Sequence, residues 1–389
     1  MVTLSEGLQM TTHASAQSLH ELVQNNKLPT ITATQLVNKW QAETLARRRN
    51  LKSYFNDHFA TLIASPSYAA QAGESVAPVI YRGTAVTAKS GEHAFFFVEK
   101  STEYRKQPLG DNAVASRTGT VVPLWHTMIP DALAREKAAS DLVDAGLTPH
   151  FCLVYKTVVK RLPGDYITFT RYTEFAGPKT VAECLEDETY RKSLAFELHA
   201  KLQVTTAFAV ALKHVDTAFF QGDLHTGNVV VQPLAADGPS GVAIENPFCA
   251  TYKSRFLFRI IDFISAFAPL DYGAYYDDAP EFFASVFHAL FHKQRYALAD
   301  ILAFFYQFDV TAGRPFSMLT SLAFTYVHQN STRKEVDVAK GLAQMLLSFY
   351  DDPPGPGTLY GARRRRRGST RRSGRKTSRR RGSTRGGRK

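Results

Sequence analysis

The chain has 389 residues, of which 44% are hydrophobic and 21% are charged, so it is long enough for two lobes and is not disordered by composition. Its formal net charge of +12 is uneven, because 15 of the 47 Lys and Arg lie in residues 363–389, where Asp and Glu are absent. The preceding residues carry 32 basic and 35 acidic side chains, an ordinary balance that places the excess charge in the tail alone.

Residues 1–76 are predicted to form an N-terminal helical extension, with Thr34 as a helix cap. Residues 77–176 then form a strand-rich N-lobe. Runs of β-branched and aromatic residues predict strands at 77–81, 94–98, 120–124, 151–159 and 166–175. A helix is expected over 131–145, since Pro130-Asp131 suits its start and Gly146 its end.

Residues 177–350 are predicted to form a helical C-lobe, because apolar residues recur there at three- and four-residue steps. Helices are expected at 194–212, 280–291 and 298–306, with short strands at 229–231 and 256–261. The Asp-, Pro- and Gly-rich segment 351–357 should end the last helix. The whole pattern predicts an α+β protein with two lobes and a C-terminal tail.

Three widely spaced cysteines, Cys152, Cys184 and Cys249, form no CxxC pair, which indicates free thiols in a reducing compartment. The first thirty residues lack a signal pattern, and no run of about 18 apolar residues could span a bilayer. We therefore expect an intracellular protein with no membrane partner.

The sharpest pattern is Gln221-Gly-Asp-Leu-His-Thr-Gly-Asn228, followed later by Arg259-Ile-Ile-Asp-Phe263. Asp223 and Asn228 are five positions apart between a helix and a short strand, so both side chains can point to one place. Asp223 can accept the proton of a hydroxyl, while Asn228 and Asp262 offer the oxygen ligands that Mg²⁺ prefers. One base and two metal ligands are the minimum that phosphoryl transfer requires of such side chains.

These two segments resemble the catalytic loop and metal-binding motif of the protein-kinase-like superfamily. The loop is especially similar to those of aminoglycoside and choline kinases and of divergent kinases of large DNA viruses. The resemblance covers about residues 77–310. It implies a two-lobed protein-kinase-like fold, use of ATP and Mg²⁺, Asp223 as the catalytic residue, and Asn228 and Asp262 as metal and cofactor ligands.

The resemblance also implies a lysine on an N-lobe strand that contacts the nucleotide phosphates and pairs with a helix glutamate. Lys100 and Glu136 are the matching residues. The segment 120–124 could instead be the lysine-bearing strand, although it contains no lysine. The family's hinge binds adenine through main-chain groups, which match the Glu174 carbonyl and the Ala176 N–H.

Two departures from the family bear on the substrate. His225 stands where Ser/Thr kinases carry a phosphate-contacting lysine, and its loop-bracing or phosphate-facing role is favoured over metal binding. The chain also reaches Pro280 within about twenty residues of Asp262 and has no Ala-Pro-Glu motif, so the long activation segment of typical protein kinases is missing.

The tail Arg363–Lys389 alternates arginine blocks with Gly, Ser and Thr and has no large apolar residue, which predicts disorder. Arginine forks pair with phosphates, so nucleic acid is its expected partner. We expect a Ser/Thr protein kinase acting on an unidentified protein, in a nucleus, a viral factory or a virion. The alternatives are an aminoglycoside- or choline-type kinase and an inactive kinase-fold protein associated with nucleic acid or a virion.

Overall fold

The computed structural model describes residues 42–63, 67–70, 79–88, 91–106, 114–115, 121–122, 128–163, 166–177, 179–215, 218–233, 242–244, 252–263 and 279–351. All of them belong to the compact unit that ends at Asp352. The predictions for Thr34, for the linker and for the basic tail lie outside the described residues.

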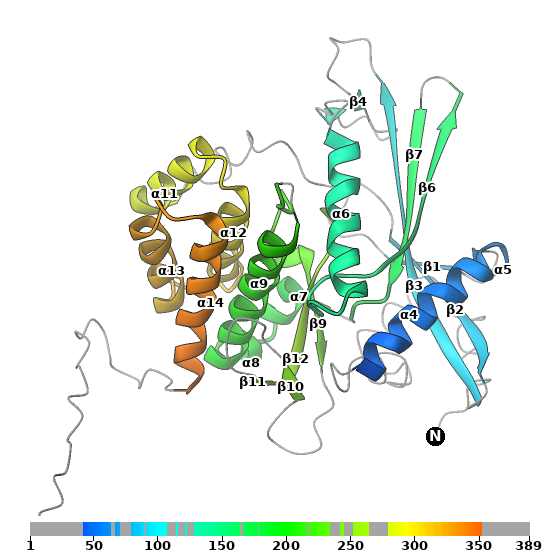
Figure 1. The fold of residues 1–389 in the computed structure, drawn as a ribbon, viewed down its shortest axis with the longest axis horizontal. Helices are drawn as coiled ribbons and strands as arrows, with labels where there is room; N and C mark the ends of the chain where they lie inside the picture. Colours follow the sequence, from blue (N-terminus) through cyan, green and yellow to red (C-terminus); the bar gives the residue numbers. More distant parts are fainter. Residues whose placement is uncertain are drawn as a thin grey trace, which may run out of the picture. The chain divides into compact units, whose positions relative to one another are not determined.

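The N-lobe is built on an antiparallel sheet (Figure 1), in which β3 pairs with β2 and β7, and β7 also pairs with β6. Its strands are β1 Ser67–Ala70, β2 Val79–Ala88, β3 Gly91–Lys106, β4 Val114–Ala115, β5 Val121–Val122, β6 Val154–Leu162 and β7 Tyr166–Glu174. The β3–β7 register sets Lys100 opposite Arg171. Strand β5 pairs with β4 rather than with β7, whereas β3, which carries Lys100, pairs with β7 directly.

Helix α4 (Ala42–Asp57), in the predicted extension, packs against this sheet. Phe55 is fully buried, with its ring centroid 5.0 Å from that of Phe97 on β3 and 5.5 Å from that of Tyr172 on β7. Helix α5 (Phe59–Ile63) follows directly and also contacts β2. The end of the predicted extension therefore contributes to the core of the N-lobe.

Helix α6 (Met128–Asp144) is the helix expected over 131–145 (Figure 1). It ends in a Schellman motif, because the Gly146 N–H donates to Val143 O and the Leu147 N–H donates to Leu142 O. Gly146 has φ 75°, in the left-handed region that favours glycine. The predicted terminator thus performs its expected role.

The lobes are joined through a segment that lies against the C-lobe backbone. A Cβ on Gly177 would come within 2.6 Å of Val231 O, so glycine permits the close approach here. Beyond it, β8 (Lys179–Thr180) pairs with β9 (Val229–Pro233). Thr180 then caps the next helix in a capping box with Glu183.

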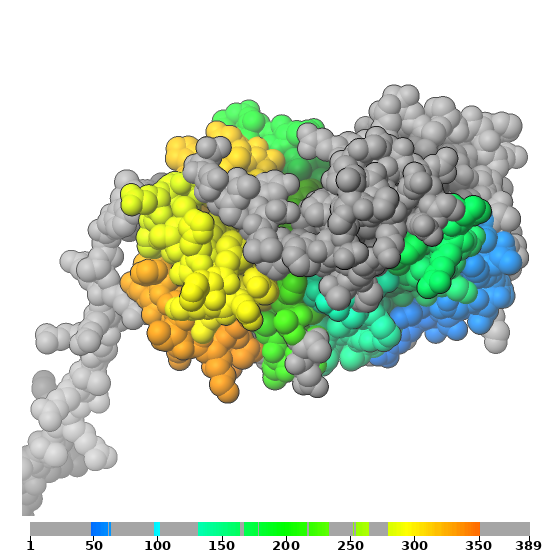
Figure 2. All heavy atoms as spheres, turned by 90° about the horizontal axis from the view of Figure 1, so that it is seen from above, coloured from blue at the N-terminus to red at the C-terminus, as the bar shows by residue number. Residues whose placement is uncertain are grey.

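The C-lobe is mainly helical, and helix α9 (Leu194–His214) packs against α12 (Tyr296–Thr311) and α14 (Glu335–Asp351) (Figure 1). Figure 2 shows the yellow-to-orange residues of the last helices at the opposite end of the compact unit from the blue residues of α4. Its elements are α7 Val181–Leu185, α8 Glu188–Arg191, α9 Leu194–His214, the 3₁₀ turn η1 Thr226–Asn228, β10 Val242–Ile244, β11 Tyr252–Ser254, β12 Phe256–Ile260, α11 Glu281–His292, α12 Tyr296–Thr311, α13 Met318–Gln329 and α14 Glu335–Asp351. The predicted α+β class, with a strand-rich N-lobe and a helical C-lobe, is confirmed. None of the helices in the described ranges has the length and apolarity to cross a bilayer.

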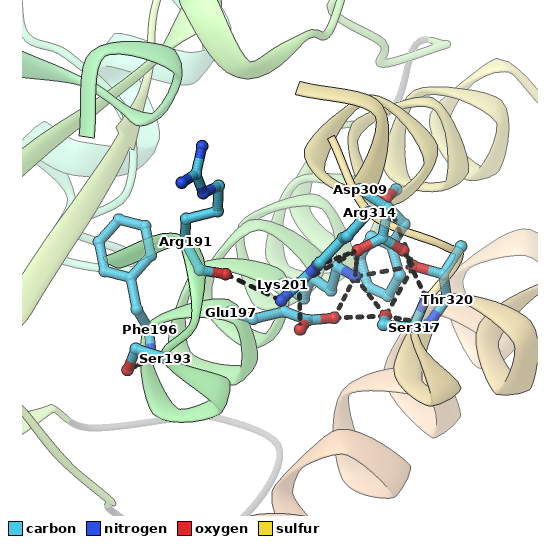
Figure 3. Close-up of polar contacts among 10 residues, drawn as sticks. Arg191, Ser193, Phe196, Glu197, Lys201, Asp309, Arg314, Ser317 and Thr320 are labelled. Atoms are coloured by element: carbon cyan, nitrogen blue, oxygen red, sulfur yellow. Dashed lines mark hydrogen bonds and ion pairs between the residues drawn. The ribbon is translucent and has the colours of Figure 1, made fainter. Parts of the chain in front are cut away.

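A charged network is buried between α9, α12 and α13 (Figure 3). The Lys201 amine has no exposed side-chain surface and donates to Glu197 (2.5 Å), with Asp309 Oδ1 at 3.6 Å. Arg314, just before α13, pairs with both Glu197 and Asp309. Lys201 also donates to the hydroxyl of Thr320 (2.7 Å). Two cations and two carboxylates therefore balance inside the lobe and tie its helices together.

A second buried polar group, His150, makes the stability of the fold depend on pH. Its Nδ1 lies 3.2 Å from Phe258 O, and burial lowers the pKa of His150 to about 3. The folded protein thus keeps this ring neutral, whereas the unfolded chain protonates it near pH 6.5. The free energy of unfolding should be greatest above pH 6.5 and decline as the pH falls toward 3.

The variant His150→Asn can keep a donor to Phe258 O but has no group that titrates in this range. Between pH 7 and pH 5, its free energy of unfolding should fall by about 2 kcal/mol less than that of the wild type. Urea unfolding at both pH values measures this difference. The exposed His214→Asn serves as the control, with the wild-type dependence expected. An unchanged dependence in His150→Asn would show that this ring is not the group that titrates.

Candidate active site

A buried carboxylate on α12 holds the loop that precedes β9. Asp300 is 1% exposed and accepts hydrogen bonds from the N–H of Gln221 (2.5 Å) and of Gly222 (3.1 Å). Gly222 has φ 94°, a conformation that favours glycine. The sequence analysis missed Asp300, whose one signal was a carboxylate within an apolar helix pattern.

Gln221 links this loop to the second motif. Its Nε2 donates to the carbonyl oxygens of Ile261 (3.2 Å) and Asp262 (2.8 Å), and its Oε1 accepts the Asp223 N–H (2.6 Å). Asp262 has φ 65°, a strained backbone conformation for a residue with a side chain. Gln221 therefore fixes the backbone of both acidic residues at once.

Asp223 and Asn228 face each other across the loop. The Asn228 amide nitrogen donates to Asp223 O (2.8 Å), which leaves the amide oxygen for a cation. The Asp223 carboxylate is 29% exposed, and His225 Nε2 lies 3.8 Å from it. His225 Nδ1 accepts the Gly227 N–H (3.0 Å), so the imidazole braces the loop as expected.

The Asp262 carboxylate lies between two cations from the N-lobe. Lys100 pairs with its Oδ2, and Arg171 donates to its Oδ1 at 3.0 Å. Arg171 also donates to Glu136 Oε1 on α6 at 2.9 Å. Lys100 therefore reaches the predicted site from β3, and Asp223, Asn228, Asp262 and Lys100 come together from distant parts of the chain.

The structure corrects the prediction that Lys100 pairs with Glu136. Arg171 takes the place of Lys100 as the partner of Glu136. The cause is the β3–β7 register, which sets the two cations side by side. A guanidinium has five donors in a fixed plane and can bridge two carboxylates, whereas an amine is a compact single charge. Arg171 was not among the site residues predicted from the sequence.

The predicted hinge contains a second buried ion cluster. The Glu174 side chain is 1% exposed, accepts from Arg48 Nε of α4 (3.0 Å), and lies 3.7 Å from Arg259 Nη1. Burial alone would raise the pKa of Glu174, but Arg48 and Arg259 outweigh it and hold that pKa below its usual value. Arg48 belongs to the predicted N-terminal extension and was not expected to reach the hinge.

The two main-chain groups predicted to bind adenine, the Glu174 carbonyl and the Ala176 N–H, differ in their hydrogen-bonding surroundings. The Glu174 carbonyl lies 3.8 Å from the Cys152 thiol. Ala176 is 5% exposed, and no residue that the structure describes accepts its N–H. Binding of adenine by these two groups stays a prediction.

The two acidic residues differ in their electrostatics. Burial, with Asp262 and Asp300 nearby, raises the pKa of Asp223 to about 7. Burial also acts to raise the pKa of Asp262, but Lys100 and Arg171 outweigh it and keep that carboxylate ionised. Asp223 can therefore take up a proton near neutral pH while Asp262 remains an anion, a division of labour typical of acid–base sites.

The donor set fits a magnesium–nucleotide complex. Asn228 and Asp262 offer hard oxygen ligands, and Lys100 brings a cation beside them. The described residues contain no group of three His, Cys, Asp or Glu side chains that could hold a metal ion alone. Mg²⁺ usually takes one or two protein carboxylates and completes its coordination with phosphates and water.

Comparison with known proteins gives matches among solved structures but none by sequence. No family model and no curated protein matches the chain. Among solved structures, one match is "WaaP in complex with acyl carrier protein", at 12% identity and a TM-score of 0.34, covering 77% of this chain and 96% of that chain.

Proposed function

We propose that this chain is a phosphotransferase that uses ATP and Mg²⁺, with Asp223 accepting the proton of the attacking hydroxyl. The observation that supports it best is the convergence of Asp223, Asn228, Asp262 and Lys100, with a neutralisable carboxylate beside a permanently ionised one. Catalysis of phosphoryl transfer depends mainly on positioning and on charge neutralisation, and this set provides both.

The magnesium–ATP complex, when bound, supplies the phosphoryl group and part of the charge neutralisation. Asn228 and Asp262 would hold the cation through their side-chain oxygens. Lys100 would bind phosphate oxygens, and the main chain at Glu174 and Ala176 would bind adenine. Asp223 orients the acceptor hydroxyl and takes its proton, since its raised pKa matches neutral pH.

The acceptor that we propose is a Ser or Thr side chain of a protein. The basic tail supports it, because a polyanion-binding arm is hard to explain on an enzyme for free small molecules. His225, which takes the place of the family lysine, favours a small-molecule acceptor as the second candidate. The ionisable residues of the site argue against an inactive protein.

Incubation with radiolabelled ATP and Mg²⁺ tests the proposal. Basic proteins, an aminoglycoside and choline are offered in parallel, with Asp223→Asn as the control. Label on Ser or Thr of a protein that the variant fails to transfer is the expected result. Label on a small molecule alone would favour the second candidate, and no transfer to any acceptor would count against an active kinase.

The same proposal assigns nucleic-acid binding to residues 363–389. Deleting them removes 15 positive charges and should abolish binding while ATP binding remains. If about six to ten phosphates are contacted, raising salt from about 50 to 200 mM should weaken full-length binding by roughly 10³–10⁵-fold. Filter binding with a mixed-sequence duplex measures both effects. Equal, salt-insensitive affinity in the two proteins would contradict it.

A further inference from the structure

Four charged side chains form an ion-pair network between the N-lobe elements β3, β7 and α6 and Asp262, which follows β12. Lys100 and Arg171 are the cations, and Glu136 and Asp262 are the carboxylates. Arg171 and Glu136 are 4% and 7% exposed, whereas Lys100 is 16% exposed. The arginine is thus the inner cation and the lysine the outer one.

The two cations hold Asp262 through different oxygen atoms. Arg171 Nη2 donates to Oδ1, and Lys100 pairs with Oδ2. The other terminal nitrogen of Arg171, Nη1, donates to Glu136. Asp262 could release the Lys100 amine and still be oriented by Arg171, and Glu136 would keep its partner as well.

Within the described part of the chain, Lys100 pairs with one carboxylate, whereas Arg171 pairs with two. Among the residues that the structure describes, the Lys100 amine forms an ion pair with Asp262 and none with Glu136. An amine on a flexible stem can exchange one anion for another at little geometric cost, unlike a guanidinium held at both ends. The cation nearer to solvent is therefore also the one that can move.

We propose that Arg171 is a positioning residue that joins Glu136 of α6 to Asp262, and that this arrangement frees Lys100 to bind the nucleotide phosphates. The inference rests on the proposed function and deepens it, because it divides between two side chains the tasks that one lysine was predicted to perform. Arg171 acts through Asp262 and touches no reacting atom.

Double-mutant cycles in urea unfolding test the positioning role without any activity measurement. The variants are Arg171→Met, Lys100→Met and Glu136→Gln, singly and in pairs. Arg171 and Glu136 should be strongly non-additive, because either single change leaves a buried charge that the double change removes. Lys100 and Glu136 should be nearly additive. If Arg171→Met does not fold, Arg171→Lys and the Arg171→Met/Glu136→Gln pair take its place.

Titration with ATP, in the presence and absence of Mg²⁺, tests the division of tasks. Lys100→Met should weaken ATP binding about 10- to 100-fold in both conditions and leave adenosine binding unchanged, because it removes a charge-assisted phosphate contact. Arg171→Met/Glu136→Gln should keep its metal-free affinity for ATP but lose the gain that Mg²⁺ confers on the wild type. Arg171→Lys should restore part of that gain.

Strong coupling of Lys100 to Glu136, with Arg171 additive, would overturn the inference while nucleotide binding by the wild type still supports the proposed function. A wild type that binds neither ATP nor ADP would overturn both together. A loss of metal-dependent affinity on Lys100→Met alone, with Arg171→Met/Glu136→Gln unaffected, would also overturn the inference.

Discussion

Asp223→Asn is expected to lower the rate of phosphoryl transfer by about 10²–10⁴-fold, the range in which a positioned general base contributes. The amide has nearly the same shape as the carboxylate but cannot accept the proton of the acceptor hydroxyl. Asp223 is partly exposed, and its hydrogen bonds to Gln221 and Asn228 use the backbone, so the loop should keep its form. Single-turnover transfer from labelled ATP, together with the Kd for ATP, measures the effect.

Asp141→Asn is a matched control, since Asp141 is an exposed carboxylate on α6 that pairs with Lys137. It should transfer phosphate as the wild type does. The raised pKa of Asp223 adds a second observation: kcat/KM of the wild type should fall about tenfold per pH unit below pH 7, as Asp223 becomes protonated. Undiminished transfer by Asp223→Asn would reject Asp223 as the base.

The largest loss of stability is expected from Lys201→Met. Removing one member of a buried ion pair typically costs about 3–5 kcal/mol, because the remaining charge stays buried. Here Glu197 and Asp309 would keep Arg314 as their one cation in the network of Figure 3. Urea unfolding gives the change in the free energy of unfolding.

The chain offers a matched control for this change. Lys192 and Glu188 form an i,i+4 pair of the same kind, but their side chains are 74% and 62% exposed. Lys192→Met should therefore cost no more than about 0.5 kcal/mol. Lys201→Met/Glu197→Gln should recover part of the loss by restoring the charge balance. A cost below about 1 kcal/mol for Lys201→Met would show that the network does not stabilise the lobe.

The described elements follow the sequence closely where local rules act. The periodic apolar face predicted α9, and Gly146 marked the end of α6, because both depend on residues within one or two helical turns. Helix α12 extends to Thr311, beyond the predicted end at Tyr306. Asp309 interrupts the apolar pattern of this helix in the sequence. In the structure it is nevertheless buried, because its partners on α9 and α13 satisfy its carboxylate.

In the candidate site, the sequence by itself determined the residues of the loop and of the metal-binding motif. Both motifs are defined by residue types at fixed spacing along the chain. Only the tertiary structure decided which charges meet. Arg171 replaces Lys100 beside Glu136 through a strand register, and Arg48 and Asp300 reach the hinge and the loop from elements 126 and 79 residues away. Such pairings depend on which elements pack together and on how many donors a side chain can direct, and neither follows from local sequence pattern.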